Sequence, residues 1–326
     1  MRPASATATA GRLFAISDLH LSRKENREAL EHFAADTARR FDDDWLIVAG
    51  DVGERVEHLQ FALGILTRRF ARVFFTPGNH DLWCPTGATD RTRGQARYDE
   101  IVATCREFGA LTPEDPYARW PLDSARGGHA LSAVEGSTDP TTYIVPMFLL
   151  FDYSFRPADV SREDAVGWAR ASGVGASDES LLHPDPWPSR DAWCHARCDA
   201  TEARLAALPA GSRTILINHW PLRYDLARPP RIPRFSIWSG TTRTEQWGER
   251  FRARAVISGH VHLRTTLVRH GVRYEEVSLG YPRDWRRERG LAYYLREILP
   301  VPDERFVPPF DPYRHTQEVP SSRGLY

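Results

Sequence analysis

The feature that most constrains this fold is a set of five short polar segments, each directly following an apolar stretch typical of a β-strand. The strand-like stretches cover residues 13–16, 45–48, 73–76, 214–217 and 255–258. The strands of a parallel sheet end at a common edge, so they would bring the polar segments together. These segments are Ser17-Asp18-Leu19-His20, Ala49-Gly50-Asp51, Gly78-Asn79-His80-Asp81, Asn218-His219 and Gly259-His260-Val261-His262.

The metal donors that these segments offer are carboxylate oxygens, imidazole nitrogens and amide oxygens. This mixture is too rich in nitrogen for a magnesium or calcium site and suits two divalent transition metals, namely manganese, iron or zinc. Donors two residues apart, as in Asp18-Leu19-His20, point the same way in an extended or tightly turned stretch. An isolated pair of this kind is more often a surface accident, but five segments in this order predict a metal centre.

The order of the segments resembles the calcineurin-like metallophosphoesterase superfamily, whose pattern is D-x-H, G-D, G-N-H-[DE], a lone His and G-H-x-H. The resemblance implies an α/β fold, a layered α/β/β/α sandwich with its active site at the carboxyl-terminal ends of the strands. It implies that His80 binds neither metal and faces the substrate as a catalytic residue. It further implies one metal held by Asp18, His20, Asp51 and His262 and a second held by Asp51, Asn79, His219 and His260, with Asp51 as the bridge.

Other stretches, 150–157, 218–223, 233–241 and 278–282, are similar to bacterial phosphopantetheinyl hydrolases within that superfamily. The resemblance runs from about residue 12 to 290. It implies hydrolysis of the phosphodiester that joins 4′-phosphopantetheine to a serine of acyl carrier protein, which would make this carrier the partner. Arg156 and Arg223 would then suit a phosphate or an acidic protein face, and Tyr153 would line the pantetheine channel; a surface ion pair or a core aromatic ring is the alternative for each.

Other activities use the same metals. A phosphomonoesterase acting on a small metabolite and a cyclic-nucleotide phosphodiesterase both stay open, whereas His20 favours diesterase work. A protein serine/threonine phosphatase is disfavoured because the intervening region does not resemble that subfamily. A non-catalytic binding scaffold of the same fold is disfavoured by the intact donor set and by His80.

The composition is that of a globular enzyme. The chain has 326 residues, and its 43 basic side chains match its 43 acidic ones, which argues against a nucleic-acid or membrane-surface partner. No stretch approaches the roughly 20 apolar residues of a membrane span, and the first residues lack a signal-peptide core, so we expect a cytoplasmic protein. Cys194 and Cys198 lie four residues apart, and we expect packing thiols on a helix in preference to half of a zinc site.

The pattern along the chain predicts one metallophosphoesterase domain over residues 1–299, with a pocket-shaping region at 82–212, and a proline-rich tail at 300–326. Helical periodicity covers 25–40, 54–70, 95–108 and 191–208, and the run 142–151 is strongly β-like. A β-α-β-α-β start implies right-handed crossovers and a parallel sheet. Strands at 255–258, 263–269 and 272–278 are predicted to form a β-meander that turns at His270-Gly271.

Overall fold

The computed structural model describes residues 11–84, 92–120 and 140–300, and its first sheet is built by a β-α-β-α-β unit. Strands β1 (Leu13–Ile16), β2 (Phe41–Val48) and β3 (Phe70–Phe75) are parallel. Helices α1 (Lys24–Ala35) and α2 (Val56–Arg69) connect them. Strand β10 (Arg296–Leu299) returns from the end of the described chain and pairs antiparallel with β1, which gives the order β10-β1-β2-β3.

The second sheet has six strands in the order β4-β5-β6-β7-β9-β8. Its centre is parallel, and the two edge strands, β4 (Ala118–Arg119) and β8 (Thr266–Arg269), are antiparallel to their neighbours. The parallel strands are β5 (Thr142–Pro146), β6 (Arg213–Ile217), β7 (Ala253–Ser258) and β9 (Val272–Glu276).

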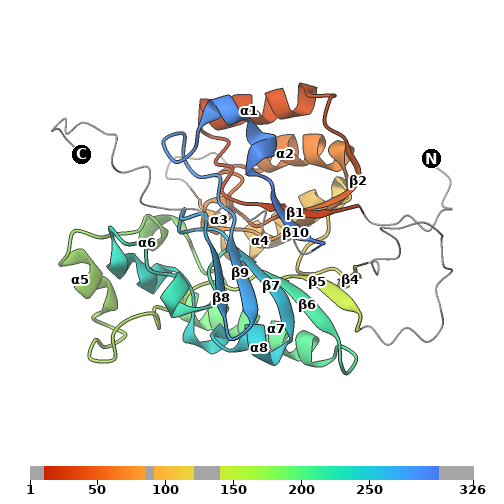
Figure 1. The fold of residues 1–326 in the computed structure, drawn as a ribbon. Coiled ribbons are helices and arrows are strands. Elements are labelled where there is room, and N and C mark those ends of the chain that lie inside the picture. The colour runs from red at the N-terminus through yellow and green to blue at the C-terminus, as the bar shows by residue number, and fades with distance from the viewer. Residues whose placement is uncertain (1–10, 85–91, 121–139, 301–326) are drawn as a thin grey trace.

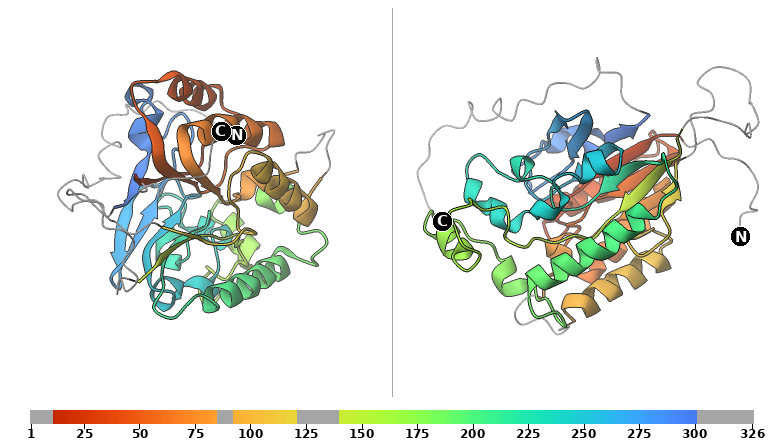
Figure 2. Two further views of the ribbon diagram at one scale, coloured as in Figure 1. Left: turned by 90° about the vertical axis from the view of Figure 1, so that its right-hand side faces the viewer. Right: turned by 90° about the horizontal axis from the view of Figure 1, so that it is seen from below.

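Helices cover the outer faces of the two sheets. In Figure 1, α1 and α2 lie above the first sheet, while α7 (Arg190–Ala206) and α8 (Trp247–Arg250) lie below the second. Helix α4 (Gly94–Glu107) packs beside α2, and Figure 2 shows it running alongside α7. The result is the α/β/β/α sandwich that the sequence predicted.

The two sheets pack against each other through alternate residues of their strands. Residues 13 and 15 of β1, 45 and 47 of β2, 215 and 217 of β6, and 255 and 257 of β7 belong to one buried apolar cluster between the sheets. The intervening residues, such as Phe14, Leu46 and Val256, belong to a second cluster that includes the helices. Strands buried on both faces explain why the sequence shows continuous apolar runs in place of alternation.

Most predicted elements are found within a few residues of their expected ends, including all five strands that precede the polar segments. The β-meander prediction was wrong. Although β8 and β9 form an antiparallel hairpin turned at His270-Gly271, β9 lies between β7 and β8 and is parallel to β7. The run 142–151 is also only half strand, because β5 ends at Pro146 and the chain then stays buried without pairing as a strand.

No helix within the described ranges is both long enough and apolar enough to cross a membrane. Residues 1–10 and, beyond Pro300, the predicted proline-rich tail lie outside the described residues. The sandwich therefore determines where the polar segments meet.

Candidate metal centre

The structure brings the polar segments of both sheets to one place. Asp18, Asp51 and Asn79 follow β1, β2 and β3 of the first sheet, whereas His219 and His260 follow β6 and β7 of the second. All these residues are buried. Hydrogen bonds connect the segments of the two sheets. The backbone N–H of His260 donates to the Asp18 carboxylate (3.1 Å), and the hydroxyl of Ser278 also donates to it (2.7 Å).

The backbone is left-handed at five of the predicted ligands. The φ angles are 55° at Asp18, 41° at His20, 54° at Asp51, 73° at His260 and 52° at His262. Residues with a Cβ avoid this region, and such strain is concentrated at functional sites. The sharp turns place the donors together while the residues between them, at positions 19 and 261, are buried beneath.

Two glycines make room for the crowded carboxylates. A Cβ added to Gly78 would collide with the Asp51 carboxylate, and one added to Gly259 would collide with Ser17 and with the carboxylate of Asp18. Glycine at these positions thus permits close approach of the backbone.

One half of the cluster contains Asp18, His20 and His262. The Nε2 atom of His262 lies 3.0 Å from Asp18 Oδ1 and 3.2 Å from His20 Nε2. The other ring nitrogen of His262, Nδ1, lies 3.2 Å from the carboxylate of Asp284. With its proton on Nδ1, His262 presents the lone pair of Nε2 to two other electron-rich atoms.

The other half contains Asp51, Asn79, His219 and His260. The Nδ1 atom of His219 donates to the carbonyl of Ala49 (2.8 Å), so its Nε2 atom faces Asn79 Oδ1 at 3.2 Å and Asp51 Oδ2 at 3.3 Å. The Nδ1 atom of His260 lies 3.2 Å from the same Asn79 oxygen. Acceptors crowded together in this way need a proton or a cation between them.

The electrostatics fit cations. Burial lowers the pKa of His20 to about 4 and of His260 to about 3, so both rings are neutral and available as ligands. Burial opposes charge on His219, but Asp51 outweighs it and raises the pKa of His219 to about 9. Within the described residues, two groups that could hold an ion, Asp18-His20-His262 and Asp18-Asp51-His219, share Asp18. A third group, His20-Asp51-His80, joins the two halves.

Comparison with known proteins agrees with this geometry. The family model described as calcineurin-like phosphoesterase matches residues 11–264. The chain belongs to this family. A curated relative, the [acyl-carrier-protein] phosphodiesterase PptH of Mycobacterium tuberculosis, is 45% identical over 291 residues, which cover 89% of this chain and 84% of the relative. The crystal structure of phosphopantetheinyl hydrolase PptH from the same organism matches 93% of this chain and all of that one, with a TM-score of 0.78 and 42% identity. The family and the clusters together support divalent metal ions.

In this phosphoesterase fold His80 lies at the edge of the cluster and has a partner that the sequence did not indicate. Its Nδ1 donates to Glu54 (3.0 Å), and its Nε2 lies 4.0 Å from Asp51 Oδ2. Burial opposes charge on His80, but Asp51 and Glu54 outweigh it and raise the pKa of His80. The ring also packs on Trp83, with ring centroids 3.6 Å apart. Glu54 and Trp83 therefore hold the His80 ring in place, and the two carboxylates favour its protonated form.

Two further carboxylates support the centre. Asp81 accepts the backbone N–H groups of Asp51 (2.8 Å) and Gly78 (2.8 Å), and so ties the second polar segment to the third. Asp178, at the start of α6 (Asp178–Leu181), accepts from the side-chain amide of Asn79 (3.0 Å) and the indole of Trp83 (2.6 Å). This contact orients the Asn79 amide so that its oxygen faces His219 and His260.

The predicted substrate-binding residues have protein partners. Arg156 donates to the carbonyls of Tyr153 and Val160, and Arg223 pairs with Asp225 at 2.9 Å. Tyr153 is buried and donates to Glu179 (2.9 Å). Their contact with substrate stays a prediction.

Neither cysteine of the pair in α7 belongs to a group of described residues that could hold a metal. Cys194 and Cys198 are both buried and free. Both belong to the buried apolar cluster that includes α7.

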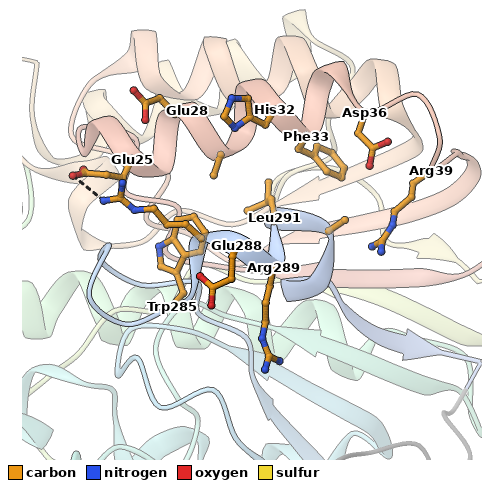
Figure 3. Close-up of a pocket in the computed structure, with 14 residues that line it drawn as sticks. Glu25, Glu28, His32, Phe33, Asp36, Arg39, Trp285, Glu288, Arg289 and Leu291 are labelled. Carbon is orange, nitrogen blue, oxygen red and sulfur yellow. Dashed lines mark ion pairs between the residues drawn. The ribbon is translucent and has the colours of Figure 1, made fainter. Parts of the chain in front are cut away.

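A separate cavity of about 650 Å³ lies between α1 and residues 285–292. Figure 3 shows Phe33, Trp285 and Leu291 along it, together with side chains of both charges. It is lined by none of the metal-centre residues.

We expect Asp178→Ala to weaken metal retention at the position next to Asn79 by about 10–100-fold, since supporting partners of ligands typically have effects of that size. Asp178→Asn keeps an oxygen that can accept from Asn79 and Trp83, so it should lose less. Metal content after dialysis against a graded chelator measures this.

Ser180→Ala is the matched control, because Ser180 is exposed and its hydroxyl donates to the carbonyl of Ser177 in the same segment. Retention of metal by Asp178→Ala at the level of this control would contradict the orienting role of Asp178.

Proposed function

We propose that this protein is a dinuclear metal-dependent phosphodiesterase that releases 4′-phosphopantetheine from holo-acyl carrier protein. The donor cluster supports the chemistry, and the 45% identity to the mycobacterial phosphodiesterase over 89% of the chain supports the substrate. The proposal includes a cytoplasmic location and no nucleic-acid or membrane partner. It also includes one domain over residues 1–299, in which region 82–212 shapes the pocket.

The proposed ligands follow the two halves of the cluster. Manganese and iron suit the mixed imidazole and carboxylate donors best, and zinc is the alternative. Asp51 is the proposed bridge because it belongs to one group with His20 and to another with His219. One metal would be held by Asp18, His20, Asp51 and His262, and the other by Asp51, Asn79, His219 and His260.

Metal ions bound here would polarise the phosphoryl group and activate the attacking water. The residues of the chain orient the proposed ligands and supply a proton to the leaving group. Asp284 and the Ala49 carbonyl fix the rings of His262 and His219, so that in each ring Nε2 faces the cluster. Glu54 holds Nδ1 of His80, which leaves the Nε2 proton available to the oxygen of the leaving group.

We expect Asp51→Asn to abolish turnover and to lower metal content at both positions, because an amide brings no charge to either cation. Metal analysis of the purified variant, together with hydrolysis of bis-(p-nitrophenyl) phosphate, measures both effects. Two metals per chain with near-normal turnover would exclude Asp51 as the bridge.

The variants His80→Ala and His80→Asn should keep both metals and lower kcat by about 10²–10⁴-fold, since the imidazole acts on the transition state. The loss should be smaller for a p-nitrophenyl ester, whose leaving group needs little protonation. Steady-state rates for one good and one poor leaving group test this. Equal losses for both would leave His80 an electrostatic role alone.

The substrate is tested by incubating a holo-acyl carrier protein with the manganese-loaded enzyme and recording intact mass. We expect loss of the phosphopantetheine mass and recovery of the unmodified serine. A cyclic nucleotide and a metabolite monoester serve as competing substrates. Rapid turnover of either one, with no change in the carrier, would reject the carrier as substrate.

A further inference from the structure

An arginine-rich segment, residues 224–235, ends against the metal centre, and we call it the arginine loop. The ring of Phe235, at its end, stacks on the proposed ligand His260, with ring centroids 5.3 Å apart and planes 25° apart. Arg231 is four residues from Phe235, so its Cα lies at most about 14 Å from that of Phe235. The loop is thus attached directly to the metal centre.

The arginine loop carries positive charge that the protein itself does not neutralise. Arg228 and Arg231 are exposed, and neither forms an ion pair with any residue in the described part of the chain. The one acidic residue of the loop, Asp225, is already paired with Arg223 (2.9 Å) and Arg269 (2.7 Å). A free positive surface of this kind attracts an anionic partner.

The loop is also held rigidly. Prolines at positions 229, 230 and 233 fix the backbone, and Arg234 stacks on Trp168 at 4.6 Å. Beside the two free arginines, the side chain of Ile232 projects into solvent with 43% of its surface exposed. A preordered surface of two charges around an apolar contact loses little conformational freedom when a partner binds.

A second positive group lies at another ligand. Tyr281 stacks on His20, with ring centroids 4.4 Å apart, and the exposed Arg23 lies over the Tyr281 ring at 5.5 Å. Arg23 likewise has no ion-pair partner within the described ranges. The cavity of Figure 3 differs, because its acidic and basic side chains offset one another.

The chemistry of the proposed substrate explains why the arginine loop would contact a carrier protein. If the proposed function holds, the bond to be cleaved joins phosphorus to the side-chain oxygen of a serine, so the carrier surface itself must approach the metals. We propose that the arginine loop, with Arg23 as a second contact, is the docking surface for a carrier protein with acidic residues around that serine. This inference rests on the proposed function for the identity of its partner.

The test compares Arg228→Glu/Arg231→Glu with the matched control Arg72→Glu/Arg213→Glu. Both control arginines are exposed and lie in β3 and β6, before the strand ends that lead to the metal centre. Binding of a fluorescently labelled apo-acyl carrier protein, the product, is measured by anisotropy at low and high salt. Hydrolysis of bis-(p-nitrophenyl) phosphate reports on the metal centre.

We expect the loop variant to raise the Kd for apo-carrier by about tenfold or more at low salt, with a smaller effect at high salt, because salt screens exposed charges. Turnover of the small diester should stay within about twofold of wild type. The control should match wild type in both assays. Ile232→Ser should weaken binding by a factor that changes little with salt, since its contact is apolar.

Two results would overturn the docking surface: no binding of apo-carrier to the wild-type enzyme, or equal affinities of the loop variant and the control. Failure of the proposed function looks different. In that case the holo-carrier keeps its prosthetic group with the wild-type enzyme, whether or not apo-carrier binds to the arginine loop.

Discussion

The metal centre depends on the packing of two sheets so that their parallel strands end at one place. Donors from the first sheet and imidazoles from the second become neighbours only because the apolar residues between the sheets hold β1 and β2 against β6 and β7. Bonds such as that from His219 Nδ1 to the carbonyl of Ala49 then cross between the sheets. A shift of one sheet over the other would separate both proposed sets of ligands at once.

The cluster brings carboxylates and imidazoles together in the protein interior. Without a cation, burying these groups lowers the stability of the fold. Asp18 and Asp51 are almost fully buried, and the Nε2 atoms of His219 and His262 lie within 3.3 Å and 3.0 Å of their carboxylate oxygens. The left-handed turns add strain that tertiary packing maintains. In a phosphoesterase both costs serve preorganisation, because the proposed ligands would need little rearrangement to bind metal ions.

The carboxylates outside the five segments control orientation. Glu54 holds His80, Asp284 holds His262, and Asp178 holds Asn79. Asp178 differs from the other two because it comes from the region between the third and fourth polar segments. This bond links that region to a proposed metal ligand, so changes there can act on the metal centre without touching the metals.

The sequence by itself determined the donor types, their order and the apolar strands before them, because a strand followed by a turn and a donor is a local pattern. It also predicted the layered fold. Tertiary structure alone decided that β9 lies between β7 and β8, since pairing β8 with β9 leaves open which of the two strands lies beside β7. It likewise chose the orienting partners: Asp178 is 99 residues from Asn79, and Glu54 is 26 from His80. A lone acidic residue at such a distance carries no local signal, because packing between distant segments selects which carboxylate meets which ring.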